Sequence, residues 1–381
     1  MNVYNIDGKK YDLTNFIKYH PGGDDIKQFS FNKTKMDINN HYIMIHQRKF
    51  PHESMKSYLI EDSNKEILEI SCFGKDLYKY IRDKKIYNKL NILYYIKSFG
   101  ITSLMILFNT YFILSGSIVY AILCSLFICL FMFNVGHDLS HGVVSNKYYY
   151  RIMKNIVNIY TGYDYDIWIN EHIVRHHNYT NDIMIDENIQ HTPVLSLHPN
   201  ANMNWCNKFQ SYYLHIILLV YGLRIPFEKF LFDFKFILYK IIFFSRLILL
   251  PLIFNYNINT ILGIILLLCT QGFILGSIFI ISHNFDGAKK GISSDCWYKY
   301  QVENSSSYGG KLACYLTGGL NYQIEHHLFP RISYIYYPEI QPIVMELCKK
   351  HNVNYTYFPT YYENVKSTLK HLYKLTNTNS S

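Results

Sequence analysis

A long stretch without charged residues constrains this chain more than any other feature of its sequence. Residues 98–136 contain no Asp, Glu, Lys or Arg. As a helix, these 39 residues would extend roughly 58 Å at about 1.5 Å each, about twice the hydrocarbon thickness of a bilayer. The stretch therefore predicts a hairpin of two membrane-spanning helices that turns at Ser115-Gly116-Ser117. A buried helix pair of a soluble protein is the alternative.

A second apolar run predicts another pair of membrane helices. Residues 247–285 form a run of the same length, interrupted by the polar segment NYNINT at 255–260. The first helix of this pair has to begin upstream, near Phe236, to reach across a bilayer. We therefore expect four spans in two hairpins. The composition agrees, because charged residues make up only 17% of the chain, against roughly 25% in soluble domains.

The basic residues predict the orientation of these spans. Neither short connection within a hairpin carries Lys or Arg, so these residues gather in the N-terminal region, the segment between the hairpins and the C-terminal tail. By the positive-inside rule, we expect both termini to face the cytosol in an integral membrane protein of the endoplasmic reticulum. The net charge of +9 is spread over membrane-flanking segments, which suits membrane lipids as partners and predicts no nucleic-acid partner.

The chain divides into three parts by character. Residues 1–61 are polar and contain short elements, including a hairpin expected to turn at Asp7-Gly8 and a Pro-Gly-Gly turn after His20. Residues 62–96 form a linker with an amphipathic, basic stretch, which is either a helix on the membrane surface or an ordinary solvated helix. Residues 97–381 hold the predicted spans.

The N-terminal module resembles cytochrome b5. HPGG alone would indicate only a loop, but VYNIDGKKYDLTNFIKYHPGG matches that family over nearly the whole module. The resemblance implies that His20 is one axial ligand of haem b. The second would be His46, which follows Asp37 at the family's spacing, with His41 as the rival ligand. A haem with two His ligands transfers single electrons. The family's usual first strand is missing here, so we expect weaker haem binding.

Three short clusters combine histidines at helical spacing. They are HDLSH with His137 and His141, HIVRHH with His172, His176 and His177, and QIEHH with Gln323, His326 and His327. Side chains three or four residues apart share one face of a helix. Imidazole binds iron well, and seven clustered histidines exceed the needs of one tetrahedral zinc, so two metals are the simplest interpretation. His283 ends the fourth span and is either an eighth ligand or an interfacial helix-end residue.

HDxxH, HxxxHH and QxxHH in this order, behind a cytochrome b5-like module, resemble the front-end fatty acyl desaturases of the membrane desaturase superfamily. The resemblance implies a mainly α fold with a four-helix membrane domain, a cytoplasmic histidine-rich cap and a small α+β haem domain. It also implies two non-haem Fe, with Asp138 and Glu325 orienting the imidazoles. The implied metal ligands are His137, His141, His172, His176, His177, His283, Gln323, His326 and His327.

The same resemblance implies a reaction. The enzyme would use O2 to insert a cis double bond between an existing double bond and the carboxyl end of a fatty acyl lipid or acyl-CoA. Electrons would come from an NAD(P)H-dependent cytochrome b5 reductase through the fused haem domain. Aromatic residues around Trp168 are expected to line an apolar tunnel for the acyl chain or to lie at the membrane interface.

Three alternatives share part of this pattern. A sphingolipid long-chain-base desaturase has the same fused haem module and the same Gln in its third cluster. A lipid hydroxylase of the same superfamily would return a hydroxyl group instead of removing a second hydrogen. A membrane-anchored electron-transfer haem protein would bind no catalytic metal in its histidine clusters.

Overall fold

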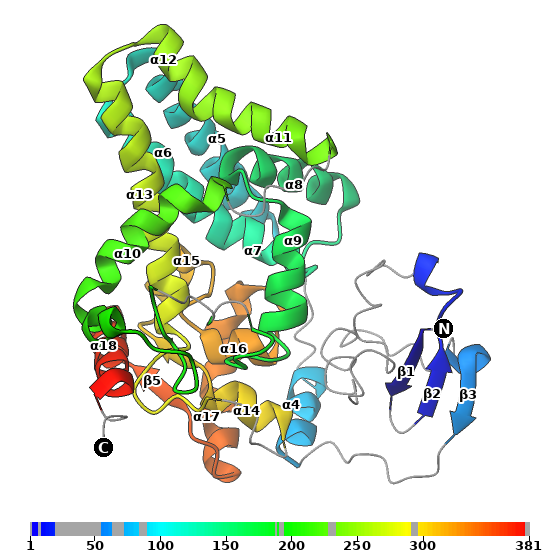
Figure 1. The fold of residues 1–381 in the computed structure, drawn as a ribbon. Helices are drawn as coiled ribbons and strands as arrows, with labels where there is room; N and C mark the ends of the chain where they lie inside the picture. Colours follow the sequence, from blue (N-terminus) through cyan, green and yellow to red (C-terminus); the bar gives the residue numbers. More distant parts are fainter. Residues whose placement is uncertain are drawn as a thin grey trace.

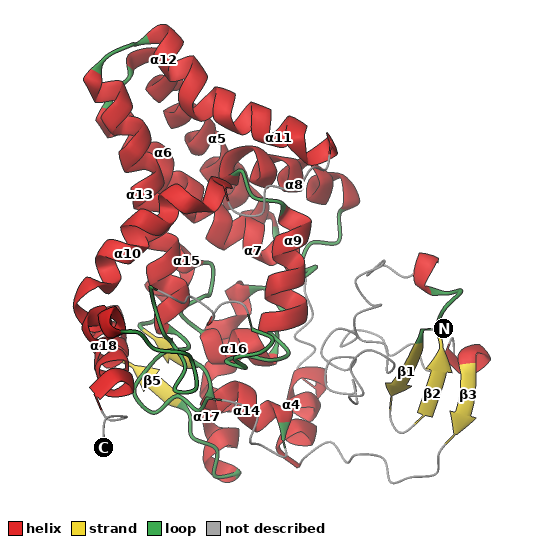
Figure 2. Cartoon of the chain, in the orientation of Figure 1, coloured by secondary structure: helices red, strands yellow, loops and turns green. Residues whose placement is uncertain are grey.

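The computed structural model describes residues 2–6, 9–19, 55–62, 72–83, 90–186, 189, 194–227, 234–290 and 296–377. Within these ranges the protein is mainly helical, with two small sheets (Figure 2). Long helices form a bundle, and shorter helices and loops form a cap at one end of it (Figure 1). The mainly α fold class predicted from the sequence is confirmed.

Four helices are long and apolar enough to cross a membrane, as predicted. The first is α5 (Ile92–Ser115), and the second combines α6 (Ile118–Phe131), a π-helical turn (Met132–Gly136) and α7 (His137–Ser140). The third combines α11 (Phe234–Phe244), a second π-helical turn (Ser245–Leu249) and α12 (Leu250–Phe254), and the fourth is α13 (Ile258–Ile281).

Local signals explain where these helices begin and turn. The side chains of Asn91 and Asn257 cap α5 and α13, since each accepts a hydrogen bond from a backbone N–H in the first turn. Gly116 ends α5 with φ of 63°, a left-handed conformation that favours glycine. A Cβ at Gly116 would also lie 2.1 Å from Oγ1 of Thr260, so the turn is packed against the second hairpin.

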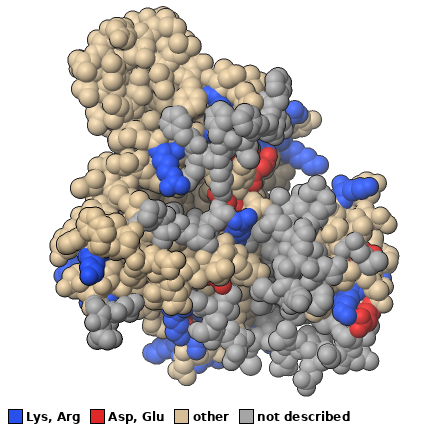
Figure 3. Space-filling model, in the orientation of Figure 1, with Lys and Arg blue, Asp and Glu red and all other residues tan. Residues whose placement is uncertain are grey.

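The outer surface of the bundle suits a lipid environment. Large apolar side chains are exposed along the length of α5, from Ile92 to Leu114. In the space-filling view, the lobe around α12 carries neither basic nor acidic residues, whereas charged residues gather toward the cap (Figure 3). Because apolar surface of this extent is unfavourable in water, these helices are expected to face lipid.

Helix α10 (Gln210–Arg224) packs closely on α13. Gly222 and Gly272 permit this contact, because a Cβ on Gly272 would lie 2.2 Å from the backbone nitrogen of Gly222. On the other side of the bundle, α8 (Lys147–Thr161) packs against α11 and leads to α9 (Tyr165–Ile169). These helices connect the two hairpins.

The cap is built mainly from the C-terminal third of the chain. Its helices are α14 (Trp297–Glu303), α15 (Lys311–Thr317), α16 (Gln323–Leu328), α17 (Tyr337–Lys350) and α18 (Tyr361–Asn377). Strands β4 (Ser306–Tyr308) and β5 (Thr356–Phe358) pair in parallel. Helix α16 lies between α14 and α17 and carries the QIEHH cluster. Burial on several sides fixes this short helix, which propensity alone could not stabilise.

The amphipathic stretch of the linker forms helix α4 (Cys72–Asp83). The structure adds a contact that the sequence did not predict, because the apolar face of this helix packs on the cap. Phe73 and Leu77 are buried against the cap, and Asp76 pairs with Lys350 at 2.6 Å and His351 at 2.9 Å. The pattern was ambiguous because an apolar helix face fits a protein surface as well as a membrane.

The other sheet lies in the N-terminal module and has three strands. Strands β1 (Val3–Ile6) and β2 (Lys9–Asp12) pair antiparallel, which confirms the predicted hairpin, and β3 (Leu59–Asp62) pairs with β2. Tyr4, Ile6 and Ile17 lie in a small apolar core of this module. The expected haem ligands His20 and His46, and the rival His41, lie outside the described residues.

Candidate metal centre

The structure brings the histidines of all three clusters, and His283, into one buried region. Seven of them form two groups in which the potential ligand atoms lie within 4.8 Å of one another. The first group is His137, His141, His172 and His326, and the second is His176, His283 and His327. Each group therefore combines residues that are more than 100 positions apart in the sequence.

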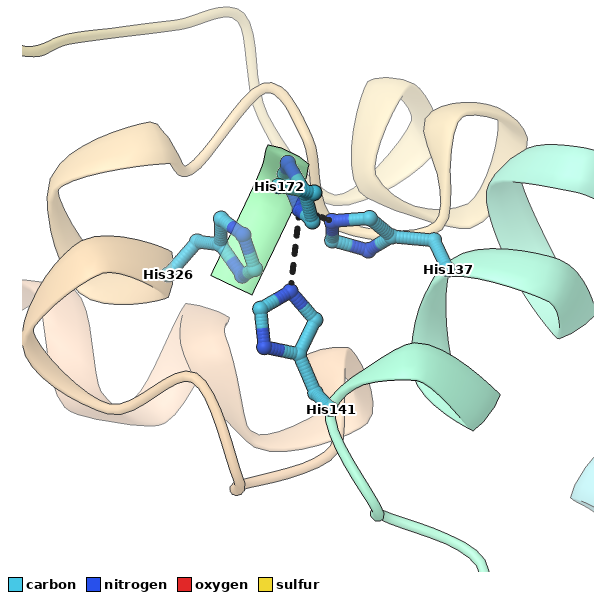
Figure 4. Close-up of side chains that lie close together, drawn as sticks. All are labelled: His137, His141, His172 and His326. Atoms are coloured by element: carbon cyan, nitrogen blue, oxygen red, sulfur yellow. Dashed lines mark hydrogen bonds between the residues drawn. The ribbon is translucent and has the colours of Figure 1, made fainter. Parts of the chain in front are cut away.

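The four side chains of the first group point toward a common centre (Figure 4). The Nε2 atoms of His137 and His141 each lie 3.1 Å from Nε2 of His172. Two nitrogens bound to one ion at about 2.1 Å, roughly at right angles, would be separated by about 3 Å. The spacing of these nitrogens therefore suits ligands of a single metal ion.

The second group includes Gln323 as a neighbour. Its Nε2 lies 2.9 Å from Nε2 of His283 and 3.2 Å from Nε2 of His327. The amide of a Gln can present either its oxygen or its nitrogen in this position. Gln323 thus lies where it could contribute an oxygen ligand or donate hydrogen bonds to the two imidazoles.

His177 lies between the two groups. Its ring centroid is 4.7 Å from that of His141 and 4.3 Å from that of His327. Both of its ring nitrogens are buried without a hydrogen-bond partner among the described residues, as is Nε2 of His326. A buried polar atom without a partner is unfavourable, so these nitrogens fit a site that binds metal.

Local distortions of the helices produce this arrangement. The HIVRHH cluster lies on a π-helical segment, Asn170–His176, and the backbone N–H of His177 donates to the carbonyl of His172. In a π-helix residues five apart share a face, so His172 and His177 both turn toward the first group. His137 begins α7 after another π-helical turn, and His283 follows the end of α13.

Three imidazoles are oriented by oxygen acceptors. Nδ1 of His176 lies 3.0 Å from the carboxylate of Asp186. Nδ1 of His327 lies 2.7 Å from Oε1 of Gln301, and Nδ1 of His283 lies 2.9 Å from the carbonyl oxygen of Asn304. When the proton is on Nδ1 and is donated to an oxygen, the lone pair of Nε2 is free to bind a metal ion.

A buried polar network joins Asp186 to the backbone of His283. Asn181 donates from its backbone to Asp186 at 2.8 Å and from its side chain to the carbonyl of His283 at 3.2 Å. Lys290 donates to the side chain of Asn181 at 3.0 Å and to the same His283 carbonyl at 2.9 Å. Asn181 has φ of 63°, and the network holds it in this less favourable conformation.

The sequence did not reveal these supporting residues. Asp186, Gln301 and Asn304 belong to no recognisable motif, and only their three-dimensional contacts reveal their role.

The acidic residues inside the motifs differ from expectation in their hydrogen-bond partners. Asp138 accepts hydrogen bonds from Ser333 and Tyr94, and Glu325 accepts from Tyr355 at 2.7 Å and Ser307 at 3.2 Å.

Those contacts are with hydroxyl groups rather than imidazoles. The expectation that Asp138 and Glu325 orient imidazoles is therefore not supported by their described hydrogen bonds. Burial raises the pKa of Glu325 to about 7. Both residues instead tie the metal-binding segments to the surrounding cap.

The electrostatics of the region favour neutral imidazoles. Burial, followed by the neighbouring histidines, lowers the pKa of His141, His177 and His327 well below the usual value. Burial and His176 lower the pKa of His283 to about 3. Groups with lowered pKa values are unprotonated at neutral pH, and only neutral imidazole has a lone pair for a metal.

Trp168 forms one wall of the first group. Its ring stacks on His172 with centroids 5.0 Å apart and an interplanar angle of 6°. Tyr165, which precedes it on α9, donates to the carbonyl of Gly136 at 2.7 Å. The structure thus places Trp168 against a histidine of the first group, and its expected position in an acyl-chain tunnel or at the membrane interface stays a prediction.

The fold and this site define an integral membrane protein with a buried, histidine-rich centre suited to two metal ions. Comparison with known proteins identifies its family. The sequence model of the fatty acid desaturase family matches residues 115–359, so the chain belongs to that family. The matched region contains every histidine of the two groups and His177.

Several characterised desaturases are similar over most of the chain. Acyl-lipid (8-3)-desaturase B of Dictyostelium discoideum is 28% identical over 98% of this chain and 90% of its own length. Acyl-lipid (7-3)-desaturase of Rebecca salina is 27% identical over 96% of this chain and 88% of its own length. The sn-1 linoleoyl-lipid 6-desaturase of Synechocystis is 25% identical over 64% of this chain and 76% of its own length.

No solved structure matches the chain significantly. The family and the relatives confirm the resemblance to front-end desaturases inferred from the histidine clusters. The protein is therefore a membrane fatty acyl desaturase, an oxidoreductase of lipid metabolism.

Replacing Asp186 by Asn tests whether the oriented imidazoles bind metal. Asp186→Asn removes the carboxylate that holds Nδ1 of His176, and loss of such a partner typically weakens metal affinity about 10- to 100-fold. We expect purified Asp186→Asn to lose iron faster than wild type to a chelator, as measured by a colorimetric iron assay.

Asp182→Asn is the matched control, because Asp182 lies in the same loop but accepts from the backbone of Met184 and Ile185. Its iron should be retained as in wild type. Equal iron loss from wild type and Asp186→Asn would contradict a role of Asp186 in orienting a metal ligand.

Proposed function

We propose that the protein is an oxygen-dependent front-end desaturase with a non-haem di-iron centre. The observation that carries this proposal is the division of seven buried histidines into two groups, with His177 between them. One ion would need only one such group, whereas two adjacent groups suit two ions that share a site.

The ligands proposed for the first iron are His137, His141, His172 and His326, and those for the second are His176, His283 and His327. His177 would bind one of the two ions, on the side of that ion that faces the second ion. Gln323 would complete the second site as a ligand or as a hydrogen-bond donor. Together with dioxygen, the bound iron supplies an oxidant strong enough to remove hydrogen from an unactivated methylene group.

The protein's own contribution is to position and shield this centre. Every histidine of the two groups is at most 6% exposed, so bulk water has little access to the reacting atoms. Exclusion of water limits side reactions of a strong oxidant. Asp186, Gln301 and the carbonyl of Asn304 hold three of the imidazoles in orientations that direct Nε2 inward.

Electrons would reach the centre from the N-terminal module. We assign residues 1–61 to a cytochrome b5-like domain with haem b bound by His20 and His46, residues 62–96 to a linker, and residues 97–381 to the desaturase domain. Because α4 packs on α17, the linker is anchored to the cap close to the histidines. Tethering then raises the effective concentration of the haem domain at its acceptor.

The external electron donor would be an NAD(P)H-dependent cytochrome b5 reductase. For the reductase and the haem domain to meet, both termini and the cap would face the cytosol, with the spans in the endoplasmic reticulum membrane. The gathering of Lys and Arg outside the short hairpin connections supports this orientation.

The proposed substrate is an acyl chain on a membrane lipid. The relatives from Dictyostelium and Rebecca are named acyl-lipid desaturases, which supports this carrier over acyl-CoA. A new cis double bond would form between an existing double bond and the carboxyl end. A long-chain-base desaturase and a lipid hydroxylase are the alternatives that the product distinguishes.

Expression in a host without polyunsaturated lipids tests the reaction. We expect a new polyunsaturated acyl chain in the phospholipids, with the added double bond on the carboxyl side of an existing one, as located by mass spectrometry of derivatised fatty acids. His327→Ala should abolish the product, because it removes a ligand from the second group.

His215→Ala should leave the product unchanged, since His215 is exposed on α10 and outside both groups. Hydroxylated acyl chains from an iron-loaded enzyme would instead support the hydroxylase. An unsaturated long-chain base with unchanged acyl chains would support the sphingolipid enzyme.

Substitution of His20 tests the electron supply. In a reconstituted system with purified cytochrome b5 reductase and no free cytochrome b5, His20→Ala should lose the bis-His haem spectrum and desaturate at a small fraction of the wild-type rate. His46→Ala should have the same effect and His41→Ala should not, if His46 is the second ligand. Wild-type turnover by His20→Ala in this system would contradict electron transfer through the fused domain.

A further inference from the structure

Helix α10 is apolar on its buried face and largely apolar on its exposed face, where His215 is an exposed polar side chain. On one face, Leu214, Leu218 and Gly222 are buried, and the two leucines belong to a core that includes Ile280 and Ile281 of α13. The other face and the turn that precedes it expose the residues that we call the α10 stripe, which are Trp205, Phe209, Tyr212, Ile216, Leu219 and Val220.

The composition of this segment is unusual for a helix exposed to water. Residues 209–223 contain no Asp, Glu, Lys or Arg, and Trp205 is 78% exposed. A helix on the surface of a soluble protein normally presents charged or polar side chains opposite its buried face. An exposed apolar stripe of this length therefore indicates a surface that something apolar covers.

Helix α10 is not among the described helices that are long and apolar enough to cross a membrane. Its 15 residues extend about 22 Å, which is shorter than the roughly 30 Å of a hydrocarbon core. Apolar helices of this length in membrane proteins lie in the interface, with one face in the upper acyl-chain region.

The contact with α13 connects the α10 stripe to the lipid-facing surface of the bundle. Large apolar residues of α13 are exposed from Ile258 to Leu266, and the helix, which is described throughout, has no exposed residue from Leu267 to Ile281. Helix α10 covers α13 directly after that point, because a Cβ on Gly222 would lie 1.9 Å from the carbonyl oxygen of Leu268.

The direction of α10 along α13 follows from two contacts. Gly222, near the end of α10, meets Leu268, whereas Leu218 lies one turn earlier and meets Gly276, closer to the end of α13. The two helices therefore run in opposite directions along this contact. In Figure 1, α10 crosses α13 between the bundle and the cap. The exposed apolar surface passes from α13 to α10 at this level.

We propose that the α10 stripe is immersed in the cytoplasmic leaflet of the membrane, at the boundary between headgroups and acyl chains. Trp205, at one end of the stripe, has the amphipathic ring that prefers this boundary. Lys208 and Arg224 are exposed near the two ends of the segment, where basic side chains can reach lipid phosphates. Bilayer lipid, rather than another protein, is the occupant that continuity with the spans favours.

This position has a consequence for the site. Helix α10 packs on the half of α13 that leads to His283, and an interfacial α10 would fix the depth of that half relative to the bilayer. The histidine groups would then lie just outside the headgroups, on the side of the cap. An acyl chain that extends out of the membrane could reach them there. The assignment to the cytoplasmic leaflet rests on the orientation proposed above. The immersion of the α10 stripe depends only on α10 and the spans, and a different reaction at the metal centre would not affect it.

Tryptophan fluorescence in vesicles tests the position of α10. The chain contains 3 Trp, so Trp205→Phe serves as the parent, and each probe variant adds one Trp to it. The probes on the α10 stripe are Ile216→Trp and Tyr212→Trp. Ile106→Trp on α5 is the lipid-exposed control, and Met345→Trp on α17 is the control in the cap.

Each protein is reconstituted into phosphatidylcholine vesicles with or without bromine near the top of the acyl chain, and iodide is the aqueous quencher. Subtracting the parent's emission gives the signal of the added Trp. We expect brominated lipid to quench Ile216→Trp and Tyr212→Trp several-fold more than Met345→Trp, and iodide to show the reverse order. The difference between wild type and the parent should place Trp205 in the shallow lipid region.

Two results would overturn the proposal. Quenching of both α10 probes by iodide, to the extent seen for Met345→Trp, would mean that the stripe faces water. Protection from both quenchers would mean that protein covers it, and a second copy of the chain would then be detected by cross-linking in the same vesicles. Two probes at different positions guard against the failure of one variant to fold.

Discussion

Burial of eight imidazoles in one region is the constraint on which the rest of the structure depends. Each buried nitrogen without a hydrogen-bond partner costs about 1–3 kcal/mol, and both nitrogens of His177 are in this state among the described residues. Metal coordination would convert this cost into a gain. The arrangement is thus poor as a core and suitable as a metal centre.

The surrounding scaffold serves to bring distant segments to this centre. His137 lies in the last turns of the second span and His283 directly follows the fourth, so the ends of two long helices define its height above the membrane. A π-helical segment turns His172 and His177 toward the same group, and α16 adds its histidines from the cap. The hydrogen bonds of Asn181 and Lys290 then tie the second group together.

The sequence predicted features that repeat locally and missed those that depend on distant contacts. Four spans and three histidine clusters follow from runs and spacings within short segments. The division of the histidines into two groups could not be predicted, because His172 and His176 are close in sequence but belong to different groups. Asp186 and Gln301 carry no motif, and the apolar face of α4 could not reveal that the cap would bury it.

We propose that these histidines bind two iron ions, and X-ray absorption at the iron K-edge can test this assignment. The measurement uses the iron-loaded wild-type protein, and the spectrum of the haem iron is subtracted from the total. We expect the remaining iron to have only nitrogen or oxygen neighbours at about 2.1 Å, with the outer-sphere scattering of several imidazoles per ion. Sulfur neighbours, or non-haem iron without imidazole scattering, would contradict the account.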